Sequence, residues 1–113
     1  MSEHHYAKDG LKRIGKLVEL KGDLFNALFS FDQQVFSEGA LPTKVKELIA
    51  VGCAHITRCP YCIEGHVERA RKAGATDEEI AEAIFVGVAM SAGAAVAHSC
   101  IAMEALEKPP QKD

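Results

Sequence analysis

Apolar residues recur at helical spacing along almost the whole chain, and this periodicity constrains the fold more than any other feature. One stripe, at i, i+3, i+4 spacing, consists of Val45, Leu48, Ile49, Gly52 and Ile56. No stretch of useful length alternates apolar with polar residues, as a half-buried strand would. We therefore predict an all-α protein.

Glycine and proline divide the first half of this pattern into helices. Helical spacing starts at Leu11 and stops near Gly22, and it resumes at Leu24 and stops before Gly39. A third helix starts at residue 42 or 43 and contains the stripe described above. These boundaries predict three helices before the middle of the chain.

A short break at residues 57–59 separates the third helix from a fourth. Pro60 fits the first turn of a helix, where its missing N–H leaves no backbone partner unsatisfied. The fourth helix runs to about Ala73, and Gly74 is a suitable C-cap. So short a connection predicts that the third and fourth helices form an antiparallel hairpin.

The last helical region begins at residues 76–79, TDEE, which form a capping box. We predict that this region breaks or kinks near residues 91–93 and then continues to Leu106. The chain would then be a single-domain bundle of about six helices spanning residues 1–113, and residues 108–113 would form a flexible tail.

Residues 80–103 are apolar on most helical faces, which is a large apolar surface for a chain of 113 residues. The uncharged stretch at residues 83–97 is shorter than the ~20 residues of a membrane span, and it is rich in Ala, Gly and Ser. We expect no membrane partner and interpret the region as a buried helix or helix pair. Its surplus apolar surface predicts an obligate homo-oligomer.

Composition and charge argue against several classes of protein. The chain is 48% hydrophobic and 26% charged, so it should fold, and no basic run exceeds two residues, so we expect no nucleic-acid partner. The polar opening MSEHHYAKDG lacks the apolar core of a signal peptide, which predicts a cytoplasmic protein. In that compartment a CxxC is more often catalytic or metal-binding than a structural disulfide.

Residues 59–66, CPYCIEGH, carry the main candidate site. Pro60 places Cys59 at or near a helix N-cap and Cys62 in the first turn, where exposed N–H groups favour a thiolate. The spacing lets the two sulfurs approach bonding distance, so a reversible disulfide can form. His66 lies one turn after Cys62 on the same face and could take the thiol proton.

The predicted hairpin supplies further candidates from the third helix. If the chain folds back between the two helices, Glu47 comes within reach of His66, and a carboxylate, an imidazole and a thiol stand in series. His55 lies eight residues after Glu47 on the same face, near the CxxC end. Tyr61 could donate a hydrogen bond to a bound peroxide or thiolate.

This constellation resembles the alkylhydroperoxidase D-like family of the carboxymuconolactone decarboxylase superfamily. The likeness rests first on the spacing of the motif: eleven residues separate Glu47 from Cys59-Pro-Tyr-Cys62, and three residues separate Cys62 from His66. The flanking segments also resemble the family, and they read FDQQVFSEGALPTKVKELIAV before the motif and GATDEEIAEAIFVGVAMSAGAAVAH after it. It covers residues 25–106. The resemblance implies an all-helical fold that assembles as dimers, trimers or hexamers, and we expect a trimer or hexamer.

The resemblance also implies roles for the motif residues. Cys62 would attack the peroxide, Cys59 would resolve it as a disulfide, and Glu47 with His66 would relay protons. Where the best-described members have a histidine before the second cysteine, this sequence has Tyr61. Members that decarboxylate the lactone generally lack the CxxC, which argues against that activity here.

Two assignments of the nucleophile compete. Helix capping favours Cys59, whereas the resemblance and the position of His66 favour Cys62, which we adopt. The predicted function is a thiol-dependent peroxidase or disulfide oxidoreductase that acts on a peroxide or small disulfide and is reduced by an external dithiol. Beyond the Cys59–Cys62 disulfide it would need no cofactor or metal.

Two alternatives belong to other classes of protein. The first is a non-catalytic oligomeric module that senses redox state or binds a ligand. The second is a zinc-stabilised helical domain, with Cys59, Cys62 and His66 as ligands and either His55 or Cys53 as the fourth. Outside such a site, we expect Cys53 and Cys100 to be small buried hydrophobes.

Overall fold

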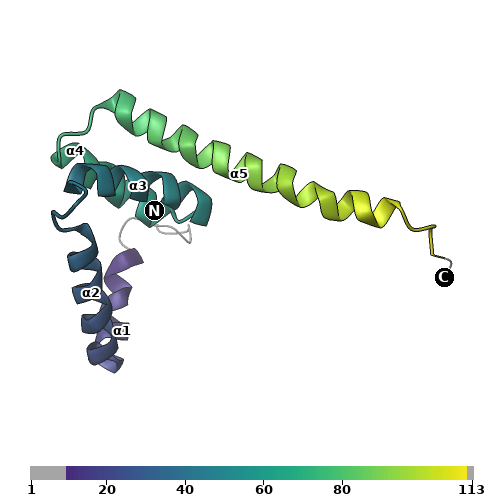
Figure 1. Ribbon diagram of the computed structural model, residues 1–113. Coiled ribbons are helices and arrows are strands. Elements are labelled where there is room, and N and C mark those ends of the chain that lie inside the picture. Colours follow the sequence, from purple (N-terminus) through teal and green to yellow (C-terminus); the bar gives the residue numbers. More distant parts are fainter. Residues whose placement is uncertain (1–9, 112–113) are drawn as a thin grey trace.

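The structure, a computed structural model, describes residues 10–111 and contains only helices and their connections within that range. The all-α prediction is confirmed. Five α-helices follow one short 3-10 helix, and Figure 1 shows their arrangement. Their bounds are η1 Gly10–Arg13, α1 Ile14–Leu20, α2 Gly22–Phe36, α3 Thr43–Thr57, α4 Pro60–Lys72 and α5 Asp77–Leu106.

The predicted hairpin of α3 and α4 is confirmed. Arg58 ends α3 in the left-handed conformation, with φ of 60°, and its N–H bonds back to the Ala54 carbonyl. Cys59 then caps α4, and Pro60 occupies the first helical position, as predicted. At the other end of α4, Gly74 has φ of 97°, which suits a residue without a Cβ. Local chemistry therefore sets both turns.

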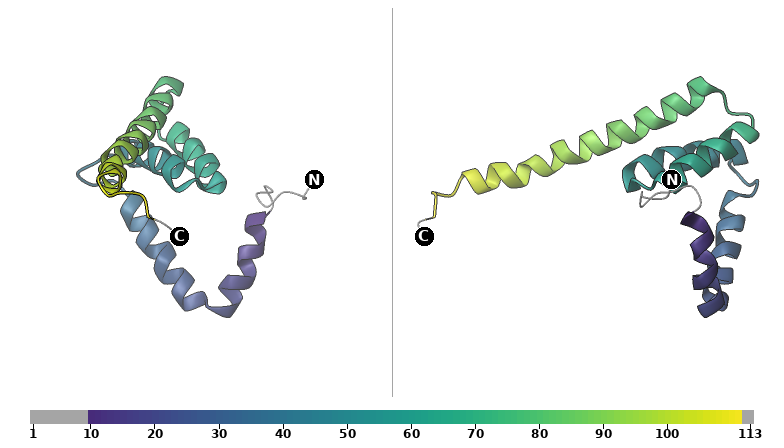
Figure 2. Two further views of the ribbon diagram at one scale, coloured as in Figure 1. Left: turned by 90° about the vertical axis from the view of Figure 1, so that its right-hand side faces the viewer. Right: turned by 180° about the vertical axis from the view of Figure 1, so that it is seen from behind.

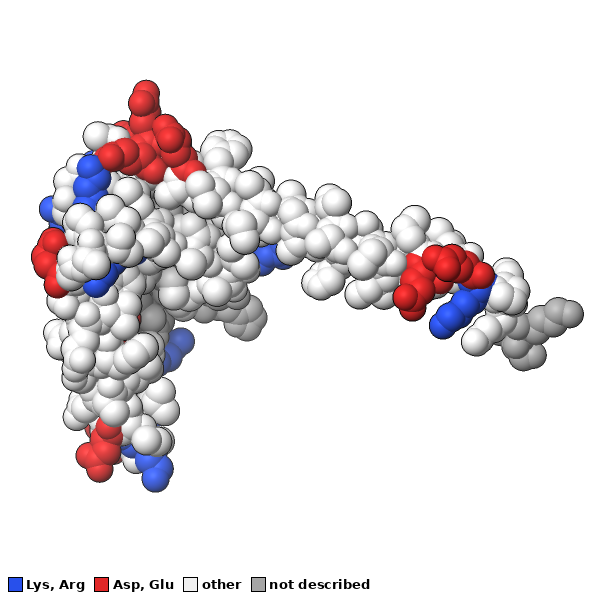
Figure 3. Space-filling model, viewed as in Figure 1, with Lys and Arg blue, Asp and Glu red and all other residues white. Residues whose placement is uncertain are grey.

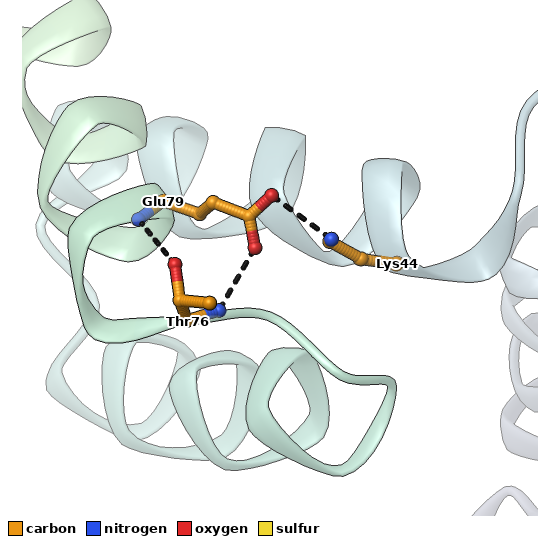
Figure 4. A network of polar contacts seen from close by, with 3 residues as sticks. All are labelled: Lys44, Thr76 and Glu79. Carbon is orange, nitrogen blue, oxygen red and sulfur yellow. Dashed lines mark hydrogen bonds and ion pairs between the residues drawn. The ribbon is translucent and has the colours of Figure 1, made fainter.

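The predicted capping box at the start of α5 is also confirmed. The Thr76 hydroxyl accepts from the Glu79 N–H at 3.1 Å, and the Glu79 carboxylate accepts from the Thr76 N–H at 2.8 Å. The second carboxylate oxygen of Glu79 forms an ion pair with Lys44 at 2.9 Å, as Figure 4 shows. The cap thereby joins the first turn of α5 to α3.

The predicted break near residues 91–93 is wrong, because α5 is one continuous helix. This accounts for five α-helices where about six were predicted. Gly93 has open space around it, so no neighbour forces the backbone to bend there. A glycine in a helix interior costs only about 1 kcal/mol relative to alanine, and the alanines around it favour the helix.

Helices α3 and α5 pack against each other at unusually close range. A Cβ added to Gly87 would lie 2.8 Å from the Gly52 carbonyl oxygen, and one added to Gly52 would lie 3.0 Å from the Ala83 carbonyl oxygen. Val51, Ala70 and Ile80 form the small buried core beside this contact, one each from α3, α4 and α5. Small residues thus allow the backbones of these two helices to approach closely.

Two arms project from this small core. Helices α1 and α2 form a V-shaped arm, and the second half of α5 extends in another direction (Figures 1 and 2). Every residue from Val88 to Leu106 is exposed. The radius of gyration is 19.4 Å, whereas a compact domain of this length has about 13 Å. The single chain therefore leaves much of its apolar surface uncovered.

Helix α5 carries no Lys, Arg, Asp or Glu between Glu82 and Glu104. Figure 3 shows the resulting uncharged stretch between charged groups at the two ends of the helix. By length and composition, α5 is long and apolar enough to cross a membrane. The same properties suit a helix buried between subunits.

Candidate active site

The hairpin brings Glu47 and His66 together. Oε1 of Glu47 lies 2.7 Å from Nδ1 of His66, across the interface of α3 and α4. The side chains are only 5% and 17% exposed, respectively. The contact predicted from the fold-back is therefore confirmed, whereas the roles of the two residues remain predictions.

The surroundings of His66 fix its orientation. A carboxylate can only accept, so Nδ1–H of His66 donates to Glu47, and in the neutral imidazole Nε2 is then the acceptor. The ring of Phe36, at the end of α2, stacks on the imidazole with centroids 5.2 Å apart and planes 26° apart. An imidazole held in this tautomer suits a general base.

Cys59 and Cys62 are free thiols in unequal environments. Cys59 is the N-cap of α4, and its sulfur accepts a hydrogen bond from the Cys62 N–H at 3.3 Å. The hydrogen bond from the Cys62 thiol, followed by those from the backbone N–H groups of Cys62 and Tyr61, lowers the pKa of Cys59. The helix N-terminus therefore favours a thiolate at Cys59, as capping chemistry predicts.

The pKa of Cys62 shifts in the opposite direction. It is raised because the thiol donates to Cys59, because the group is partly buried, and because charge at Cys59 repels a second thiolate. The Arg69 guanidinium opposes these effects. In the reduced pair, Cys59 is thus the preferred thiolate and Cys62 the preferred thiol.

Cys62 and His66 line one cavity of about 500 Å³ between α2, α3 and α4. Its walls are mostly apolar, and two charged residues, Asp32 and Lys46, also line it. Such a cavity suits a small organic molecule fixed by a few polar groups. The remaining lining residues are Val35, Phe36, Leu41, Ile49, Ala50, Cys53, Ala54 and Thr57.

The two supporting candidates lie elsewhere. His55 is half-buried, and its Nδ1 lies 2.7 Å from the Val51 carbonyl oxygen of its own helix. The Tyr61 hydroxyl lies 2.6 Å from where a Cβ on Gly10 would stand, so Tyr61 packs against the start of η1. Neither residue lines the cavity that Cys62 and His66 share.

The zinc alternative receives no support from residues 10–111. Among them, no three His, Cys, Asp or Glu side chains are placed to hold a metal ion. The expectation that Cys53 and Cys100 are buried is wrong for the single chain, because both are exposed. Cys53 instead forms part of the cavity wall.

Sequence reasoning missed two residues that affect the site. Phe36 comes from α2, and no local pattern signals its contact with His66. Arg69 follows Cys62 by seven residues, which places both on one face of α4, and this spacing could have revealed its electrostatic effect.

The profile of the carboxymuconolactone decarboxylase family matches residues 22–105. The chain belongs to this family. Among curated relatives, "Uncharacterized protein 4 in cox locus" of Paracoccus denitrificans is 45% identical over 84% of this chain and 86% of its own length. An uncharacterized protein of Cupriavidus necator is 30% identical over 73% of each chain.

A solved structure shares the fold of this family member. The crystal structure of a protein from Methanobacterium thermoautotrophicum superimposes with a TM-score of 0.71 at 34% identity. The match covers 75% of this chain and 96% of that chain. These findings confirm the resemblance to the superfamily that includes the alkylhydroperoxidase D-like proteins.

Proposed function

We propose that the protein is a thiol-dependent peroxidase or disulfide oxidoreductase whose redox centre is the Cys59–Cys62 pair. The 2.7 Å contact between Glu47 and His66 carries this proposal. It holds an imidazole as a base one helical turn from Cys62, on the wall of a cavity that admits a small organic molecule. Glu47 positions the ring and stabilises the imidazolium that forms.

In the first step, His66 accepts the proton of Cys62 at Nε2. The thiolate attacks the terminal oxygen of a hydroperoxide, the O–O bond breaks, and Cys62 becomes a sulfenic acid. The departing alkoxide takes the proton back from His66 and leaves as an alcohol. Sulfur is oxidised by two electrons, and the peroxide is reduced by two.

In the second step, the Cys59 thiolate attacks the sulfur of the Cys62 sulfenic acid. A disulfide forms, and the hydroxyl leaves with one proton as water. An external dithiol then reduces the disulfide by exchange and is itself oxidised. The lowered pKa of Cys59 supports its role as the resolving thiolate.

The assignment of the attacking cysteine is tested by serine variants. Peroxide should convert Cys59→Ser into a protein with a stable sulfenic acid at Cys62, which dimedone labelling and mass spectrometry detect. Cys62→Ser should form no sulfenic acid at a comparable rate. The reverse labelling pattern would identify Cys59, the residue whose pKa is lowered, as the cysteine that attacks the peroxide.

The relay is tested by Glu47→Gln. The amide oxygen can still accept from Nδ1–H of His66, so the ring stays in place while the negative charge is lost. We expect disulfide formation after one equivalent of peroxide to slow about 10²-fold, the usual contribution of general acid–base catalysis. Stopped-flow measurement of the rate checks this, with thermal unfolding as the control for folding. An unchanged rate would exclude the relay.

A second candidate function is a non-catalytic module that senses redox state or binds a ligand. The raised pKa of Cys62 favours it, because a protonated thiol reacts slowly with peroxide. Slow reaction with peroxides together with fast exchange with small disulfides would favour this function over the peroxidase.

The proposed cycle needs surroundings in which the thiol pair can be kept reduced. We infer a cytoplasmic protein, in which the pair is kept reduced by a dithiol. The partners are a peroxide or small disulfide, the reductant, and further copies of the chain in a trimer or hexamer. We propose neither nucleic acid nor a membrane as a partner.

A further inference from the structure

One face of α3 lines the site cavity along most of the helix. The residues that α3 contributes to the wall recur at i, i+3, i+4 spacing, and they are Lys46, Ile49, Ala50, Cys53, Ala54 and Thr57. Residues at this spacing lie on one side of a helix. Because an α-helix rises about 1.5 Å per residue, the stretch from Lys46 to Thr57 is ~16 Å long. The cavity is therefore elongated and follows α3.

The two ends of this elongated cavity differ in their chemistry. Cys62 lies in the first turn of α4, directly after the hairpin turn, so it belongs to the end at Thr57. Lys46 lies at the other end of the face, beside the loop between α2 and α3. Most of the other lining residues are apolar. The cavity thus has a thiol toward one end and a cation at the other.

The Lys46 ammonium is held in place but is not neutralised. Its Nζ donates to the Ser37 carbonyl oxygen at 2.6 Å and lies 3.6 Å from where a Cβ on Gly39 would stand. Lys46 is half-buried and forms no ion pair with any acidic residue that the structure describes. Glu38 of the same loop accepts from the Thr43 N–H instead, at 3.2 Å. An ammonium has three N–H donors, so two remain for an anion at this end of the cavity.

Asp32, on α2, is the only acidic residue among the described residues that line the site cavity. It forms no ion pair with Lys46. Asp32 also lines a neighbouring cavity of about 340 Å³, where Arg69 supplies a positive charge. The Lys46 ammonium therefore remains the group that an anionic ligand would meet in the site cavity.

We propose that the cavity takes a fatty-acid-type hydroperoxide, whose carboxylate pairs with Lys46 and whose apolar chain lies along α3 toward Cys62. This rests on the proposed function, because it takes Cys62 as the thiol that meets the peroxide. Lys46 then determines which substrates bind and takes no part in the proton transfer between Cys62 and His66. A half-buried ammonium attracts a carboxylate more strongly than one surrounded by water, because the effective dielectric constant is lower.

Unreactive analogues test the binding step apart from the redox chemistry. Octanoate, 1-octanol and octylamine share one chain length and carry a negative, a neutral and a positive head group. Lys46→Gln keeps a donor for the Ser37 carbonyl but loses the charge, whereas Lys46→Arg keeps the charge. Lys108→Gln, on the exposed segment after α5, is the control for loss of a positive charge elsewhere. Isothermal titration calorimetry with the reduced protein measures each affinity.

We expect wild type to bind octanoate at least about tenfold more tightly than 1-octanol, a difference of about 1.4 kcal/mol. Lys46→Gln should lower the affinity for octanoate about tenfold relative to that for 1-octanol. Lys46→Arg and Lys108→Gln should keep the preference of wild type. Since every variant has the same apolar surface outside the cavity, the change in preference reports the contact at Lys46.

Steady-state kinetics extend the test to substrates. Lys46→Gln should lower kcat/KM for a fatty-acid hydroperoxide about tenfold relative to kcat/KM for cumene hydroperoxide, which has no carboxylate. The loss should appear in KM, because the contact with Lys46 is the same in the ground state and the transition state. A purely structural role of Lys46 would lower both values together.

Several results would overturn the inference. These are equal affinities of wild type for octanoate and 1-octanol, a Lys46→Gln variant with the preference of wild type, or equal losses with the two hydroperoxides. A preference for octylamine that Asp32→Asn abolishes would assign a cationic ligand to the cavity instead. Failure of the proposed peroxidase function would look different, because octanoate would still bind through Lys46 while hydroperoxides left Cys59 and Cys62 reduced.

Discussion

At the scale of single residues, the two cysteines of the motif differ because they occupy different places on one helix end. Cys59 caps α4, and its sulfur accepts hydrogen bonds from backbone N–H groups. Cys62 lies inside the first turn, and its thiol donates a hydrogen bond to Cys59. His66 and Arg69 lie further along the same helix. The start of α4 thus contains a thiol with a lowered pKa beside a thiol with a raised pKa, and an imidazole lies one turn further along the helix.

This inequality predicts that two substitutions at Cys62 raise the pKa of Cys59 by different amounts. Cys62→Ala removes the hydrogen bond that contributes most to the lowered pKa of Cys59, so the pKa of Cys59 should rise toward its ordinary value. Cys62→Ser keeps a hydroxyl donor and should raise it less. The pH dependence of iodoacetamide alkylation at Cys59 measures both. Equal midpoints in the two variants would contradict the role of the donor.

At the scale of elements, the start of α5 combines a helix cap with a tertiary contact. The Lys44 ammonium, followed by the Thr76 N–H, lowers the pKa of Glu79 below its ordinary value of 4.5. The folded protein therefore binds this proton more weakly than the unfolded chain does. The ion pair therefore stabilises the folded protein at pH values above the pKa that Glu79 has in the unfolded chain. This stabilisation is lost as the pH falls through the lower pKa that Glu79 has in the folded protein.

Glu79→Gln tests this linkage. The amide can still accept from the Thr76 N–H, but its ion pair with Lys44 is lost. We expect the variant to melt below wild type near neutral pH and the difference to shrink as the pH falls below 4.5. Thermal unfolding followed by circular dichroism across this range measures it. A difference that stays constant with pH would contradict the ion-pair contribution.

The crossing of α3 and α5 allows a second test at this scale. Gly87→Ala places a Cβ 2.8 Å from the Gly52 carbonyl oxygen, so the helices must separate. We expect a loss of about 1–3 kcal/mol, as for other overpacked contacts. Gly65→Ala is the control, because Gly65 is helical with open space around it, and it should be neutral or stabilising. Chemical denaturation measures both variants.

At the scale of the whole molecule, the single chain is open and buries few of its large apolar side chains. The buried core is small, and large apolar side chains along α1, α2 and α5 are exposed. Burial of these side chains against further copies would add hydrophobic stabilisation. The proposed assembly would therefore extend the small core.

An assembly that is needed for folding has a thermodynamic signature. Because association stabilises only the folded chains, the unfolding temperature should rise with protein concentration. We expect wild type to melt several degrees higher when its concentration is raised about 100-fold, a change worth about 2.7 kcal/mol per binding event. Differential scanning calorimetry over that range measures it. A constant melting temperature would indicate a self-sufficient monomer.

Most of the fold was predictable from the sequence because local chemistry specifies it. The left-handed turn at Arg58, the Cys59 cap and the Thr76 capping box each depend on residues within one helical turn. The Arg58 turn and the Cys59 cap define the hairpin, and the hairpin brings Glu47 to His66. This long-range contact could therefore be predicted from local sequence features, because a single short turn connects the two helices that carry it.

Other features depended on contacts between segments that are distant in the sequence. The stacking of Phe36 on His66 and the exposure of Cys53 follow from how α2, α3, α4 and α5 lie relative to one another. The sequence by itself determined where helices begin and end and which chemical groups share a turn, because hydrogen bonding and steric limits act over a few residues. Only the tertiary structure decided which apolar faces meet and which stay open, because hydrophobic contact is non-directional and many pairings satisfy the same pattern.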